Sequence, residues 1–180
     1  ETKVYPSYCV GGNVRELTNG KYCFDYEIPE DKVSRKAFLD AGIPEKNLIE
    51  DRSRNTFLSV NLRKKEQDRG ISLAYNGWGY RNELNILMPN GKLLDVGTLE
   101  RFAWTPIWQG EQITGLKETN CGFSILALGL ERLCMVVNGL NRVQDVDYIS
   151  PFYQKMRELT GINDILAGES LRALHRIYSD

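Results

Sequence analysis

The residues best suited to chemistry are Glu131 and Arg132, which follow an apolar run at residues 122–130. Apolar residues at helical spacing continue from there to Val137. This pattern predicts a buried strand that passes directly into a helix, with the Glu-Arg pair at the junction. A guanidinium in the first turn of a helix, assisted by the free backbone N–H groups there, is suited to bind a phosphate. The alternative is an ordinary core strand and helix with a Glu-Arg pair on the surface.

Other kinds of catalytic site are disfavoured by what the sequence lacks. Its only histidine, His175, lies in a C-terminal amphipathic stretch with no nucleophile motif nearby, which argues against a Ser-His-Asp triad. The sequence contains no P-loop and no dinucleotide-binding fingerprint. None of its four cysteines forms a Cys-x-x-Cys pair, which argues against structural zinc and favours free thiols in a reducing cytosol.

The composition of the 180 residues is that of a globular protein, and the length predicts one domain spanning residues 1–180. The formal net charge of −1 gives no overall attraction to nucleic acid, so any tRNA contact would be a local patch. No apolar segment reaches the roughly 20 residues that span a bilayer, and we expect a cytoplasmic protein with no membrane partner. One basic run is either such a patch or a solvated loop; it consists of Arg52, Arg54, Arg63, Lys64, Lys65 and Arg69.

Apolar periodicity and turn residues predict an α+β domain with a mostly antiparallel sheet flanked by helices. Asn19-Gly20 and Pro89-Asn90-Gly91 predict two hairpins, with strands at residues 14–18 and 21–26 and at residues 83–88 and 92–98. Further strands are expected at residues 57–62, 71–75 and 119–128. Helices are expected at residues 30–41, 131–138, 150–159 and 169–178.

Gly129-Leu130-Glu131-Arg132 resembles motif 3 of class II aminoacyl-tRNA synthetases, in which the arginine holds the γ-phosphate of ATP. Between residues 47 and 162, further segments resemble the catalytic core of alanyl-tRNA synthetases in the same order. Residues 54–57 resemble the second half of motif 2, residues 91–96 the strand that lines the pocket, and residues 147–162 the segment after motif 3. The resemblance implies a class II synthetase-like core.

For the nucleotide, the resemblance implies ATP and Mg²⁺ as cofactors and assigns Arg132 to the γ-phosphate, with Glu131 beside it. It places Arg54 on the α- or γ-phosphate and Phe57 against adenine. Arg81, in Tyr80-Arg81-Asn82-Glu83, is a second candidate for the arginine of motif 2. The two placements conflict, because Arg54 would then precede motif 2 instead of closing it. Motif 1 has no clear counterpart.

For the substrate, Asp95 and Glu118 are candidates to bind the metal or the ammonium group, and Thr98 and Trp78 are candidates for other contacts. Alanyl enzymes hold the substrate amino group with an aspartate just before motif 3, and this chain has Ile125 at that position. Either the substrate is not alanine or another acid takes that role.

Two functions follow from the resemblance, and a chance motif in an unrelated α+β domain is the third possibility. The first function is an enzyme of the ligase class that activates an amino acid or a related carboxylic acid as its adenylate. It would pass the acyl group to a tRNA or a carrier, and the resemblance implies a homodimer. The alternative is a catalytically degenerate paralogue that binds a ligand or acts as an accessory or regulatory subunit.

Overall fold

The computed structural model describes residues 3–59 and 77–179, and it divides into two compact units, Glu1–Gly129 and Leu130–Asp180. The first unit combines a mixed sheet with helices, and the second is helical. The predicted α+β class is therefore confirmed. The strand expected at residues 71–75 and the basic residues 63–69 lie outside the described residues.

The main sheet of the first unit has the order β4-β1-β6-β7-β8, and β5 also pairs with β6. β1 and β4 are parallel, whereas the other neighbours are antiparallel. The strands are β1 (Val4–Cys9), β4 (Ile49–Asp51), β5 (Phe57–Ser59), β6 (Trp78–Leu87), β7 (Leu93–Gln109) and β8 (Gln112–Leu128).

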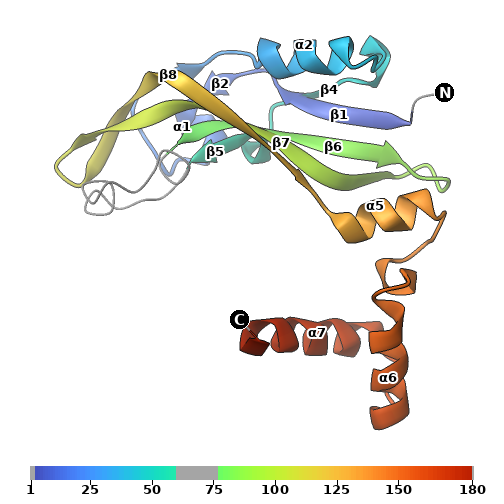
Figure 1. The fold of residues 1–180 in the computed structure, drawn as a ribbon. Coiled ribbons are helices and arrows are strands. Elements are labelled where there is room, and N and C mark those ends of the chain that lie inside the picture. The colour runs from blue at the N-terminus through green and yellow to red at the C-terminus, as the bar shows by residue number, and fades with distance from the viewer. Residues whose placement is uncertain (1–2, 60–76, 180) are drawn as a thin grey trace. The chain divides into compact units, whose positions relative to one another are not determined.

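The second predicted hairpin is confirmed, and its strands β6 and β7 extend further than the sequence pattern indicated. β7 and β8 then form a longer hairpin, which curls away from the rest of the sheet (Figure 1). A bulge lies between Trp78 and Gly79, where the strands approach closely. A Cβ atom on Gly79 would lie 2.1 Å from the carbonyl oxygen of Arg101, so this position requires glycine.

The first predicted hairpin is wrong in its strands. Residues Val14–Leu17 form a short helix, α1, because the Asn13 side chain accepts a hydrogen bond from the N–H of Arg15 and caps it. Asn19 and Gly20 do adopt positive φ, 54° and 74°, as the Asn-Gly signal predicts. The turn therefore forms, but it follows a helix. A two-stranded sheet flanks this region and consists of β2 (Gly12–Asn13) and β3 (Glu27–Ile28).

The predicted helix at residues 30–41 is confirmed as α2 (Lys32–Asp40), which lies over the β1 and β4 end of the sheet (Figure 1). Asp31 is its N-cap, and the Asp31 carboxylate accepts a hydrogen bond from the N–H of Ser34 at 3.2 Å. Gly42 follows the helix at φ 84°, as expected for a C-terminal stop.

An aromatic cluster fills the core of the first unit. Trp78 and Trp104 are 0% and 1% exposed. The Tyr22 ring lies 4.6 Å from Trp78, the Tyr80 ring lies 5.0 Å from Trp104, and the Phe57 ring contacts both tryptophans at about 6 Å between ring centroids. These residues lie in β5, β6, β7 and the segment after α1, so the cluster joins the sheet to that segment, which covers one of its faces.

The expectation that residues 119–128 are buried is wrong. The strand forms within β8, but Ile125, Leu126 and Leu128 are 40%, 58% and 50% exposed. The physical reason is that, among the described elements, only β7 makes extensive contact with β8, an edge strand of the sheet, so little packs on the faces of β8. An apolar run predicts burial only if other elements cover it, and the sequence pattern does not reveal strand order.

In the second unit, all three predicted helices are confirmed as α5 (Leu130–Val137), α6 (Ser150–Thr160) and α7 (Ile165–Ser179). α6 ends at Gly161, which has φ 68° and donates its N–H to the carbonyl oxygen of Arg157. Tyr153 of α6 and Gln144 both donate hydrogen bonds to the carboxylate of Glu169 in α7. These bonds tie α6 and α7 to the segment between α5 and α6.

Candidate functional site

The two central strands, β6 and β7, have chemically different faces. Tyr80 and Asn82 point toward the segment that leads into α2, because the Tyr80 hydroxyl donates to the carbonyl oxygen of Pro29 and the Asn82 amide donates to Asp31. We call this the core face. Side chains alternate along a strand, so the intervening residues of β6 point to the opposite face. We call that side the polar face; it carries Arg81, Glu83 and Asn85 of β6 and Asp95, Thr98 and Glu100 of β7.

The register of β6 and β7 arranges the polar face in rows. Arg81 is opposite Glu100, Glu83 is opposite Thr98, and Asn85 is opposite Asp95. Directly opposite residues share a face, with their Cβ atoms about 5 Å apart. Three residues predicted from the sequence, Arg81, Asp95 and Thr98, are thereby brought to the same surface.

The polar face is partly withdrawn from solvent. Thr98 and Asn85 are 8% and 9% exposed, and Arg81 is half-buried. The Nε atom of Arg81 is buried and has no hydrogen-bond partner among the described residues. A buried guanidinium N–H without a partner is costly, and it is suited to receive an anionic ligand. Asp95 already has a hydrogen-bond partner, because its Oδ1 atom accepts the N–H of Gly97 at 2.9 Å.

A buried polar network on the core face holds the two strands from behind. Asp31, 0% exposed, accepts hydrogen bonds from Nε of Arg101 at 3.0 Å and from Nδ2 of Asn82 at 2.9 Å. The Arg101 guanidinium lies 4.6 Å from the centroid of the Tyr80 ring. Burial raises the pKa of the Tyr80 hydroxyl far above its usual range, although the Arg101 charge opposes this shift. The network thus fixes the register on which the polar face depends.

Phe57 and Trp78 lie on the core face, away from the other predicted residues. Phe57 is opposite Tyr80 in the sheet and is 5% exposed, and Trp78 is fully buried. Their rings already contact each other, with centroids 6.0 Å apart. They occupy positions of core residues, and we therefore assign the nucleotide contacts below to arginines. Arg54 is exposed and lies in the 3₁₀ turn η2 (Arg54–Thr56), before β5.

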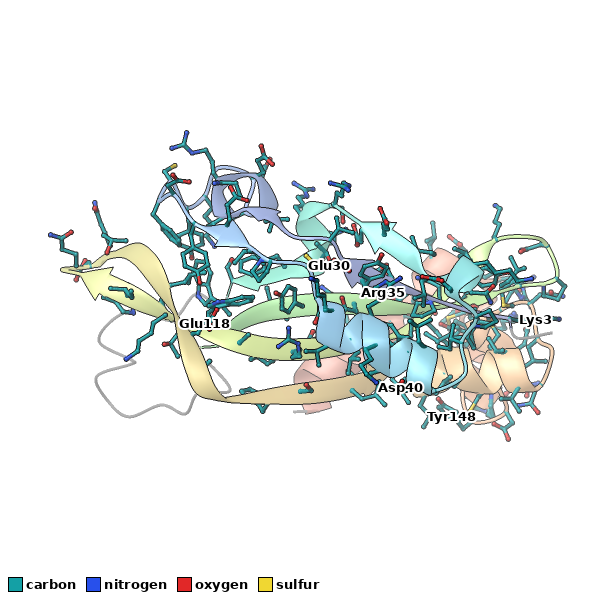
Figure 2. All side chains as sticks on the ribbon, turned by 90° about the horizontal axis from the view of Figure 1, so that it is seen from above. Lys3, Glu30, Arg35, Asp40, Glu118 and Tyr148 are labelled. Atoms are coloured by element: carbon teal, nitrogen blue, oxygen red, sulfur yellow. The ribbon has the colours of Figure 1, made fainter. Side chains whose placement is uncertain are left out.

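Asp95 and Glu118, both candidates for metal binding, lie far apart. Glu118 is opposite Trp104, nine positions along β7 from Asp95, which corresponds to about 30 Å in an extended strand. Figure 2 shows Glu118 far along the sheet from Lys3, whose carbonyl oxygen accepts the N–H of Leu87 beside the β6–β7 turn. The two carboxylates do not share one ion. No group of three or more His, Cys, Asp or Glu in the described residues is arranged to hold a metal.

Glu131 and Arg132 occupy the predicted position within the chain, immediately after a strand. β8 ends at Leu128, and the N–H of Gly129 donates to the carbonyl oxygen of Val96 in β7 at 2.9 Å. α5 then begins at Leu130, so both charged residues belong to its first turn. Glu131 is half-buried, and Arg132 is exposed. This is a geometry in which backbone N–H groups and a guanidinium can act on one anion.

Sequence reasoning did not select three members of the polar face, namely Glu83, Asn85 and Glu100. The available signal was the alternation of Arg81, Glu83 and Asn85 with Asn82, Leu84 and Ile86, which marks one polar side of a strand. Glu100 had no such signal, because its neighbours depend on the register of β7.

No protein-family model matches the sequence, and no curated protein matches it. Across the described residues, none of the helices combines the length and apolar character needed to cross a membrane.

Proposed function

We propose that the chain activates an amino acid or a related carboxylic acid with ATP, forming an acyl-adenylate and releasing pyrophosphate. The observation that carries the proposal is the polar face, where a half-buried guanidinium, three carboxylates and a buried hydroxyl occupy three consecutive rows of β6 and β7. A rigid antiparallel sheet can hold such groups at fixed positions, as a reaction catalysed by positioning requires.

The proposed reaction needs no nucleophile from the protein. A carboxylate oxygen of the substrate attacks the α-phosphorus of ATP, and the bond from that phosphorus to the bridging oxygen of pyrophosphate breaks. Negative charge accumulates on the phosphate oxygens as this occurs, and fixed cations stabilise it. Arg81, with its unpartnered Nε, supplies one such cation on the polar face.

Mg²⁺ completes the proposed charge balance on the polar face. In the second unit, Arg132 in the first turn of α5, with Glu131 beside it in the chain, is the candidate for the γ-phosphate by its resemblance to motif 3. Arg54, exposed in η2, remains a candidate for a second phosphate contact. Mg²⁺ supplies further neutralisation when bound to the phosphates, and it commonly needs only one or two protein carboxylates. Asp95 is the carboxylate that we assign to it.

Pyrophosphate exchange dependent on an added acid tests the proposal directly. The protein is assayed with ATP, Mg²⁺ and each of a full set of amino acids, and exchange with at least one of them is expected. Arg132→Ala should abolish both the exchange and the thermal stabilisation by ATP with Mg²⁺. Arg52→Ala is the matched control, because the Arg52 side chain is 77% exposed and its ion pair with Glu50 is long, at 3.9 Å. Full ATP stabilisation of Arg132→Ala would refute the assignment of that residue.

The second candidate function is a binding or accessory subunit that has lost activation. The burial of Phe57 and Trp78 favours it, because neither ring is free to stack on adenine. Ligand-induced stabilisation without any exchange would support this function. If exchange occurs, the remaining proposals are that a tRNA or a carrier accepts the acyl group and that the chain is a homodimer. Acyl transfer assays and light scattering in solution test these two points.

A further inference from the structure

The first row of the polar face continues onto β8, so that opposite charges and an apolar residue lie side by side. Glu100 is directly opposite Arg81 on β6 and directly opposite Ile125 on β8. The next row, Glu83, Thr98 and Ala127, repeats the change from polar to apolar across the same strands. Consecutive rows are about 6.6 Å apart, which is two residues along a strand.

The side chains of Arg81 and Glu100 do not form an ion pair with each other. In the described structure, no ion pair within 4.0 Å and no hydrogen bond joins their side chains. Both residues are half-buried, and the Nε atom of Arg81 lacks a partner there. A cation and an anion held close together but unpaired are complementary to a ligand that carries both charges.

The apolar half of the rows is open to a ligand side chain. Ile125 is 40% exposed, although it lies beside the charged residue Glu100 in its row. Ala127 in the next row is exposed and small. A ligand that extends from the charged pair toward β8 would therefore place its side chain on an apolar strip without added charge.

We propose that this surface selects an α-amino acid with an apolar side chain: Arg81 binds the carboxylate, Glu100 binds the ammonium group, and Ile125 and Ala127 contact the side chain. This inference rests on the proposed function and narrows its substrate, since a carboxylic acid without an amino group would leave Glu100 unpaired. Glu100 thus determines specificity, and it acts by contact with a part of the substrate that does not react.

The inference predicts a selective loss of affinity on substitution of Glu100. Direct binding is measured by calorimetry with alanine, valine, leucine and phenylalanine, and with propanoate, 3-methylbutanoate, 4-methylpentanoate and 3-phenylpropanoate as their counterparts without the amino group. At least one amino acid should bind at least tenfold more tightly than its counterpart. Glu100→Gln should weaken amino-acid binding by about ten- to a hundredfold, the usual effect of losing a charged hydrogen bond, and leave the counterpart unchanged. Arg81→Gln should weaken both.

Glu111→Gln, in the exposed β7–β8 turn, is the matched control and should bind as the unaltered protein does. Equal affinity of Glu100→Gln and the unaltered protein for the amino acid would overturn the inference. Equal binding of the amino acid and its counterpart, or no binding of any of the four amino acids, would also overturn it. Selective binding without pyrophosphate exchange would leave this inference standing and refute activation. Pyrophosphate exchange that occurs and is unaffected by Glu100→Gln would support activation and overturn this inference.

Discussion

Replacing Asp31 with alanine removes the central acceptor of the network that joins α2 to β6 and β7. The Asp31 carboxylate is 0% exposed and is contacted by Arg101, Asn82 and the N–H of Ser34. Its loss leaves three donors unsatisfied at once, and one of them is a guanidinium. We therefore expect this substitution to be among the most destabilising in the first unit.

The expected cost follows from these contacts. Removing one partner of a buried ion pair costs about 3–5 kcal/mol, because the other charge remains buried without compensation. The Arg101 side chain is 23% exposed and can be partly rehydrated, which favours the lower end of that range. The missing N-cap of α2 contributes about 1 kcal/mol of the total. We expect Asp31→Ala to lower the free energy of unfolding by about 3 kcal/mol.

Urea unfolding followed by circular dichroism measures this difference, provided that the transition is two-state. Asp40→Ala is the matched control, since Asp40 lies at the other end of α2 and pairs with Lys36 through exposed side chains. That control should cost less than about 1 kcal/mol. Asp31→Asn should have a cost between those of the other two variants. The oxygen of its amide can still accept from Arg101, but its NH₂ group would face the NH₂ group of Asn82, and both are donors. The reasoning is refuted if Asp31→Ala and Asp40→Ala cost the same.

Three further predictions concern packing, pH and the exposed edge. Gly79→Ala should cost about 3 kcal/mol in unfolding free energy, since the new methyl group would overlap a backbone carbonyl, whereas Gly115→Ala has room and should cost under about 1 kcal/mol. The hydroxyl of Tyr153 lowers the pKa of the Glu169 carboxyl, so this stabilisation is complete above about pH 5 and is lost as pH falls through the folded-state pKa. Tyr153→Phe should therefore flatten the decline of the thermal midpoint between pH 5 and pH 3; an unchanged decline would contradict this. Leu126→Lys should lower concentration-dependent light scattering with little change in the midpoint, because Leu126 is 58% exposed on an edge strand. Unchanged scattering would show that this edge does not drive association.

Local sequence signals predicted the elements whose stability depends on local chemistry. The hairpin at Pro89-Asn90-Gly91 and the end of α6 at Gly161 required only turn and cap residues, and both are present. The same kind of signal failed for residues 14–18, because Asn13 caps a helical turn there and the Asn-Gly dipeptide specifies only its own backbone angles. A turn signal does not specify what precedes it.

The rows that join β6 to β7 on the polar face could not be predicted from local patterns, because they depend on register. The bulge between Leu84 and Asn85 shifts the pairing of β6 and β7, so that Asn85 is opposite Asp95 and not Val96. A shift of one residue would move Asp95 to the other face and leave a valine opposite the amide. The hydrogen bond from the Gly97 N–H to the Asp95 carboxylate spans Val96, the extra residue of the bulge, and so stabilises it. The carboxylate that sequence reasoning chose for ligand chemistry therefore also sets the geometry of the surface on which that chemistry is proposed. Asp95→Asn keeps an acceptor at this position, so it should preserve the bulge while removing the charge, and it separates the structural role of Asp95 from its proposed role in binding Mg²⁺.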